Sequence, residues 1–244
     1  NLASDQDWSN STEVFSANWS GFSDVTSGIV GYEYSIGTTP GATDVIFWTE
    51  NGQEIEFSVP VTVLSGSDYY VSVRATDAAD NVSNIATSDG ITIDALDPTV
   101  SGILEGSTSE DYDYQQDNTS LTFSWSGSDA LRNFRNGRDL SSFSVSLGTD
   151  SAETDVVGWT NVGNANTYTM NGLSLNESVT YYVNVKALDL AGNESGIVSG
   201  DGITIDQSGP EVGTLNDGNE LDIDWVNINY LSVGNWGGFS DNLS

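Results

Sequence analysis

The sequence contains no cysteine and no histidine, and only five of its 244 residues are lysine or arginine. Without cysteine the chain has no disulfides, no thiol nucleophiles and no thiolate metal ligands. Without histidine it lacks the usual imidazole base and most zinc, copper and iron chemistry. The common arrangements for nucleophilic catalysis therefore cannot be assembled, and no glycine-rich phosphate loop is present. These absences predict that the chain is not an enzyme.

Acidic residues greatly outnumber basic ones. The 36 Asp and Glu residues give the chain a formal net charge of -31. Such a chain repels the phosphates of nucleic acid and the anionic surface of a membrane. Apolar runs also stay far below the roughly 18 residues that a membrane-spanning segment needs. We therefore expect neither a nucleic-acid partner nor membrane insertion.

The abundant Asp and Asn oxygens suit a hard cation, and calcium takes six to eight oxygen ligands in proteins. An acidic chain that lacks cysteine and has little lysine fits an extracellular, calcium-containing setting. Composition thus predicts a secreted or cell-surface protein with calcium as its cofactor. A merely solubilising acidic surface, as in salt-adapted proteins, would give the same composition.

The sequence repeats itself. Trp19, Trp125 and Trp236 each follow another aromatic residue by eleven positions, and that aromatic residue closes an Asp-x-Asp motif. The three motifs are DQDW (Asp5–Trp8), DYDY (Asp111–Tyr114) and DIDW (Asp222–Trp225). Three copies at one spacing indicate a repeat architecture.

Longer phrases return with the same period of about 111 residues. The pairs are TDVIFWT and TDVVGWT (43–49 and 154–160), YYVSVRATD and YYVNVKALD (69–77 and 181–189), and SDGITID and GDGITID (88–94 and 200–206). We therefore predict a first repeat over 1–97, a second over 98–209 and the N-terminal part of a third over 210–244. On this interpretation the chain is cut from a longer array, and its partners are neighbouring repeats.

Within each repeat, segments of four to eight residues alternate with period two and are separated by Gly, Asn, Asp and Ser. In 180–187, for example, Tyr181, Val183 and Val185 share one face and Tyr182 and Asn184 the other. About seven short strands in roughly 100 residues predict an all-β fold of tandem β-sandwiches.

Two segments carry a family resemblance: LTFSW (Leu121–Trp125), and Leu175 placed six positions before the Y-x-V-x-V-x-A strand that Tyr181 opens. They resemble the fibronectin type III pattern. Phrases such as ANWSGFSD and SDGITID are similar to those of the fibronectin-like and bacterial Ig-like repeats of large secreted bacterial adhesins. The resemblance implies tandem fibronectin III-like or Ig-like β-sandwiches. It fixes no function, because such modules serve many roles.

A fibronectin-like topology places the loop after strand B and the loop between strands F and G at the same pole as the domain's N-terminus. In a tandem array the preceding linker faces these two loops. The residues gathered at the first junction are then Asp94, Asp97, Asp129, Asp189 and Asn193, and those at the second are Asp206 and Asp241. At the free pole of the first repeat the equivalent residues are Asp24, Asp77, Asp80 and Asn81.

Carboxylates about 5 Å apart repel one another by about 3 kcal/mol at an effective dielectric constant near 20. A counter-ion is therefore expected, and extracellular modules bind calcium at about 0.1 to 1 mM. We predict that the junction acids are calcium ligands. The alternative is that they only cap turns, because Asp and Asn side chains bond neighbouring amides. The Asp-x-Asp-aromatic motif, expected just before strand B, could add ligands or close its own turn.

One loop of the second repeat, 129–142, is longer than its counterpart and contains Arg132, Arg135 and Arg138. The topology points it at the acidic first junction. The arginines are predicted to neutralise carboxylates there, replacing or supplementing calcium. A solvated loop that packs on its own domain is the alternative.

The function predicted from these features is a non-enzymatic stalk or spacer segment of a large extracellular bacterial adhesin or surface filament. Glycans or cell-surface components would be bound through other regions. The alternative is a carbohydrate- or surface-binding sandwich, which could stack sugars on aromatic rings. The candidate rings are those of Trp8, Trp48, Trp159 and Trp225.

Overall fold

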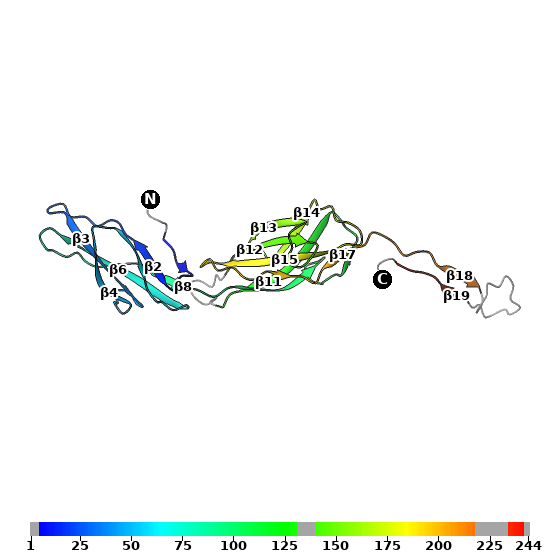
Figure 1. Ribbon diagram of the computed structural model, residues 1–244, viewed down its shortest axis with the longest axis horizontal. Helices are drawn as coiled ribbons and strands as arrows, with labels where there is room; N and C mark the ends of the chain where they lie inside the picture. The colour runs from blue at the N-terminus through cyan, green and yellow to red at the C-terminus, as the bar shows by residue number, and fades with distance from the viewer. Residues whose placement is uncertain (1–4, 131–139, 218–233, 242–244) are drawn as a thin grey trace.

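The computed structural model describes residues 5–130, 140–217 and 234–241, and every regular element in these ranges is a β-strand. Two sandwiches follow one another along the long axis of the molecule, and a hairpin follows the second sandwich (Figure 1). None of the described residues forms a helix long and apolar enough to cross a bilayer.

The first sandwich has a two-stranded sheet packed against a larger one. The small sheet pairs β2 (Val14–Asn18) with β5 (Glu56–Pro60). The larger sheet has the order β1-β8-β6-β3-β4, and β7 also pairs with β6. Its strands are β1 (Trp8–Ser9), β3 (Ile29–Gly37), β4 (Ile46–Gly52), β6 (Ser67–Asp77), β7 (Ala86–Thr87) and β8 (Ile91–Ile93).

The second sandwich repeats this plan with one more strand. Its smaller sheet has the order β14-β11-β9, and its larger sheet has the order β10-β17-β15-β12-β13 with β16 beside β15. The strands are β9 (Thr99–Glu105), β10 (Tyr114–Gln115), β11 (Ser120–Ser128), β12 (Leu140–Gly148), β13 (Val157–Gly163), β14 (Thr167–Asn171), β15 (Thr180–Asp189), β16 (Val198–Ser199) and β17 (Ile203–Ile205).

A third unit is represented by one antiparallel pair, β18 (Thr214–Asp217) with β19 (Gly234–Gly237). In this pair Asp217 lies opposite Gly234, just as Glu105 lies opposite Phe123 between β9 and β11. The hairpin therefore repeats the start of the second sandwich.

Each sandwich has its own hydrophobic core. The first gathers Phe15, Trp19, Tyr34 and Ile36 with residues of β6, and the second gathers Phe123 with residues of β12 and β15. The alternation expected for 180–187 is observed, because Tyr181, Val183 and Val185 are buried. Burial of these apolar side chains is the main stabilising contribution in each unit.

The repeated phrases of the sequence form the same local structures in both sandwiches. The Tyr69 hydroxyl accepts a hydrogen bond from Leu64 N at 2.9 Å, and the Tyr181 hydroxyl accepts one from Asn176 N at 2.8 Å. A tyrosine that ties the start of strand F to upstream backbone is a hallmark of immunoglobulin-type sandwiches. Both tyrosines are 4% exposed or less, so the tie is part of each core.

The Asp-x-Asp-aromatic motif forms the short strands β1 and β10, which pair parallel with the last strand of their own repeat. Thr92 N donates to Asp7 O and Thr204 N donates to Asp113 O, both at 2.8 Å. The motif therefore closes its own sandwich through its backbone.

Candidate metal centre at the repeat junction

Three different segments bring acidic side chains to the first junction. Asp94 directly follows β8, the last strand of the first sandwich. Asp129 directly follows β11, and Asp189 is the last residue of β15. The strand order thus gathers residues that are up to 95 positions apart in the sequence.

The carboxylates of Asp94, Asp129 and Asp189 offer oxygens that all lie within 4.8 Å of one another. Their side chains belong to residues that are 1%, 6% and 2% exposed. Asn193 completes the group, because its Nδ2 donates to the backbone oxygen of Asp94 at 2.9 Å and to Asp189 Oδ2 at 2.7 Å. One amide thus links the linker to the turn between β15 and β16.

Asp189 also caps its own turn. Its Oδ1 accepts hydrogen bonds from Gly192 N at 2.7 Å and Asn193 N at 2.8 Å. Asp77 forms the same cap in the first repeat, where Ala79 N and Asn81 N donate to its Oδ1 at 2.9 and 2.8 Å. The capping alternative therefore describes these hydrogen bonds correctly. It does not explain why three carboxylates are buried beside one another.

Burial raises the pKa of Asp94 above its ordinary value, and the neighbouring carboxylates of Asp129 and Asp189 raise it further, although Leu96 N donates to it. A buried carboxylate among like charges is stabilised by a proton or by a nearby positive charge. At this junction a proton on Asp94 or a cation between the acids would each offset the repulsion.

The geometry fits a single hard cation. Calcium binds oxygens at about 2.3 to 2.6 Å, so two of its ligand oxygens lie at most about 5 Å apart. The oxygens of the three aspartates meet this condition. Each carboxylate has about four lone-pair sites, so the capping bonds of Asp189 leave room for a metal.

The other residues predicted for the junctions lie apart from this group. Asp97 is exposed, and Asp206 and Asp241 are partly buried. None of these three is in a group of acids close enough to share an ion among the described residues. Asp206 Oδ1 accepts a hydrogen bond from Ser208 N at 3.1 Å. Arg132, Arg135 and Arg138 lie outside the described residues, so the arginine contact stays a prediction.

Sequence reasoning missed a second acidic group in the second sandwich. Glu105 ends β9 and is fully buried, and its carboxylate lies close to those of Asp111 and Asp201. Val183 N donates to Oε1 at 3.2 Å and Gly202 N to Oε2 at 3.4 Å. Burial raises the pKa of Glu105 to about 7, against the effect of these two donors. The sequence feature that pointed toward this group is Gly200, which stands in GDGITID where the matching phrase of the first repeat, SDGITID, has Ser88.

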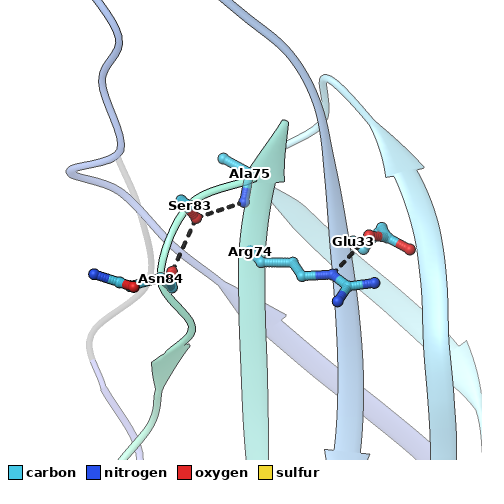
Figure 2. Close-up of polar contacts among 5 residues, drawn as sticks. All are labelled: Glu33, Arg74, Ala75, Ser83 and Asn84. Carbon is cyan, nitrogen blue, oxygen red and sulfur yellow. Dashed lines mark hydrogen bonds and ion pairs between the residues drawn. The ribbon is translucent and has the colours of Figure 1, made fainter. Parts of the chain in front are cut away.

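Two of the predicted aromatic candidates for sugar stacking, Trp48 and Trp159, have a cation over the ring, and a third, Trp8, is half-buried at the start of β1. Arg74 lies over the Trp48 ring at 4.3 Å from its centroid, and Lys186 over the Trp159 ring at 4.9 Å. Arg74 Nε also pairs with Glu33 at 2.7 Å (Figure 2). These rings lie on the edge strands β4 and β13 and stabilise the sheets through cation–π contacts. Trp225 lies outside the described residues.

The strand orders and tyrosine ties define the class: an all-β chain of tandem fibronectin III-like or Ig-like β-sandwiches, as the sequence predicted. No protein-family model and no curated protein matches the sequence.

Solved structures similar to the chain share little sequence with it. The fibronectin(III)-like modules of Clostridium thermocellum CbhA are 12% identical, with a TM-score of 0.46 over 84% of this chain and 90% of theirs. The FN1-FN3 domains of chicken CNTN1 are 13% identical, with a TM-score of 0.43 over 82% of this chain. Domains A168-A170 from titin are 15% identical, with a TM-score of 0.49 over 82% of this chain. The matches span 65% of the CNTN1 structure and 62% of the titin structure.

Proposed function

We propose that this chain is a non-enzymatic spacer segment whose joint between the first two repeats is stiffened by calcium. The observation that supports this most directly is the burial of Asp94, Asp129 and Asp189 side by side at the junction. Asp94 comes from the end of the first sandwich and the other two from the second. A cation held by all three would cross-link the two units.

The proposal assigns the chain to a large secreted or cell-surface protein of the bacterial adhesin type. The support is compositional: a charge of -31, no cysteine and repeats placed end to end. In such a protein the repeats hold a binding region at a distance, and glycans or cell-surface components would be bound elsewhere. High negative charge also discourages edge strands from pairing between molecules.

Thermal unfolding of the whole chain, with calcium and with a chelator, tests the proposal. At a calcium concentration one hundred times the dissociation constant, a single site contributes about 2.7 kcal/mol. We expect the transition that includes the junction to move up by several degrees. Asp129→Asn should abolish this calcium-dependent shift. Asp24→Asn, at the equivalent position of the first repeat, is the matched control and should leave the shift intact.

A second arm distinguishes calcium from the arginines. If the arginines neutralise the junction instead, the chelator will change nothing and replacing Arg132, Arg135 and Arg138 by Ser will lower the melting temperature. Identical melting curves in calcium and in chelator would overturn the calcium proposal, whichever result the arginine variant gives.

A further inference from the structure

The linker between the two sandwiches contains the peptide bond Asp97–Pro98. The chain has four prolines, and the other three follow Thr39, Val59 and Gly209. Asp97–Pro98 is therefore the one bond of the sequence that joins an acidic residue to a proline. The corresponding bond of the second linker is Gly209–Pro210, so the two linkers differ in whether a carboxyl precedes the proline.

The chain is tied to a different sandwich on each side of this bond. Before the bond, Asp94 N donates to Ser9 O of the first sandwich at 2.8 Å. After the bond, Thr99 begins β9, and its Oγ1 donates to Ser128 O of the second sandwich at 3.1 Å. A break between residues 97 and 98 would therefore separate the two units and leave the strands of each in place.

The side chain of Asp97 is available for a reaction with its own backbone. Asp97 is exposed, and no hydrogen bond or ion pair joins its carboxyl to another described residue. Asp94, the nearest acid in the sequence, is buried, and its Oδ1 already accepts a hydrogen bond from Leu96 N at 3.0 Å. The Asp97 carboxyl can thus rotate toward its own main-chain carbonyl group.

The proline decides which reaction this carboxyl can undergo. After an ordinary Asp, the backbone nitrogen of the next residue can attack the side chain, but Pro98 has no N–H. The remaining route is attack by a carboxyl oxygen on the main-chain carbonyl carbon of the same residue, which closes a five-membered ring. Carboxylates act as nucleophiles, and a well-oriented intramolecular group has an effective concentration of about 10⁵–10⁸ M.

We propose that the folded chain cleaves itself at Asp97–Pro98 in acid. An oxygen of the Asp97 side-chain carboxyl bonds to the main-chain carbonyl carbon of Asp97 and forms a cyclic anhydride. The bond from that carbon to Pro98 N breaks, and its electron pair stays on the nitrogen, which takes up the carboxyl proton. One water molecule then opens the anhydride.

The products are a fragment that ends in Asp97 with two carboxyl groups and a fragment that begins with Pro98 as a free amine. Each fragment keeps one complete sandwich. This inference goes beyond the spacer function and requires no metal, because it gives the linker a way to release one unit from the other.

Incubation of the whole chain in chelator tests the proposal, at the lowest pH at which circular dichroism shows the sandwiches folded. Intact-mass measurement should find the fragments 1–97 and 98–244, whose masses add up to that of the chain plus one water. At neutral pH the rate should be at least about tenfold lower, because the carboxyl proton is needed. In urea that unfolds the chain, the rate should change by less than about threefold, because the linker is already exposed.

Two variants at exposed positions provide the controls. Asp97→Glu keeps a carboxyl but enlarges the ring to six atoms, so cleavage should slow by about tenfold or more. Gly209→Asp should create a second cut before Pro210, and its side chain fits because a Cβ at position 209 meets no atom within 4 Å. An intact chain in acid would overturn the proposal. Equally fast cleavage of Asp97→Glu, or a rate that rises by more than about tenfold in urea, would do the same.

Discussion

The two complete repeats form the same acidic turn and place it in different surroundings. Asp77 and Asn81 cap the turn after β6, and Asp189 and Asn193 cap the turn after β15, with matching hydrogen bonds. Asp77 and Asn81 are at least partly exposed, whereas their counterparts are buried beneath the linker that contains Asp94. The local sequence makes a cap in both repeats, and in the second repeat the linker residue Asp94 and the loop residue Asp129 add the carboxylates that make this cap part of a candidate metal centre.

A second contrast lies at the last strand of each repeat. Ser88 accepts the Val71 N–H in the first sandwich, whereas Gly200 leaves room for Glu105 in the second. In the first repeat the acceptor for this backbone amide is the Ser88 hydroxyl on a neighbouring segment. In the second repeat it is the Glu105 carboxyl from the other sheet, which adds a buried titratable group to the core.

The largest expected effect is a difference in pH dependence between the repeats. Glu105 has a pKa of about 7 in the folded state against an ordinary value of 4.5, so the folded state binds its proton more tightly. Stability of the second repeat should therefore fall as pH rises from about 4.5 to about 7, by about 3 kcal/mol at most. Urea unfolding in chelator at several pH values measures this. Glu105→Gln should flatten the dependence.

The first repeat should respond to pH in the opposite sense and at lower pH. Hydrogen bonds from backbone amides lower the pKa of Asp24, and the side chain and amide of Asn81 lower that of Asp77. Their stabilising contribution is present above the ordinary pKa and is lost as pH falls through the lowered one. A second repeat that gains stability between pH 5 and 7 would contradict the assignment of Glu105.

The next largest effect is expected from giving the second repeat the serine that the first repeat has just before its last strand. A Cβ at position 200 would overlap the Glu105 carboxylate, so Gly200→Ser should destabilise the second repeat by about 1 to 3 kcal/mol. Combining it with Glu105→Ala should recover much of this loss, because the serine hydroxyl can then accept the Val183 N–H. Denaturant titration compares the single and double variants. A double variant no more stable than the single one would show that the two arrangements are not interchangeable.

A smaller effect is expected from neutralising the linker aspartate. Asp94→Asn keeps an acceptor for Leu96 N and removes one of three neighbouring buried charges. In chelator it should stabilise the chain by about 1 kcal/mol, and with calcium it should remove the metal-dependent shift. Asp206→Asn, at the equivalent and less buried position of the second linker, should change neither quantity. Thermal unfolding checks both variants, and a destabilised Asp94→Asn in chelator would contradict the repulsion.

The smallest effect concerns the two covered tryptophans. Arg74→Met should cost about 1 kcal/mol and Lys186→Met about 0.5 kcal/mol, because the guanidinium lies closer to its ring and also pairs with Glu33. Denaturant unfolding measures the difference between the repeats. A larger loss for Lys186→Met would reverse the ranking and contradict the geometric argument.

Much of the fold could be predicted because the same sequence phrases occur in both repeats. Alternation in 180–187 and the recurring phrases indicated strands with one buried face, and the structure has them. The repeat and a fibronectin-like topology together predicted that Asp94, Asp97, Asp129, Asp189 and Asn193 would meet at the first junction. All of them except the exposed Asp97 are in the observed group. Glu105 was missed, because no repeat period connects it to Val183 and Gly202 and the replacement of Ser88 by Gly200 does not by itself indicate which side chain fills the space.

The sequence by itself determined the tandem all-β architecture, the strands formed by the recurring phrases and the turns that their Asp residues cap, since all of these depend on neighbours within a few positions or on a repeated pattern. The tertiary structure alone decided which acids are buried. Burial depends on which chain segment covers a side chain: the linker that contains Asp94 lies beside Asp189, and a second sheet encloses Glu105. Desolvation and like charge act only after that packing, which is why the pKa values of Asp94 and Glu105 belong to the fold.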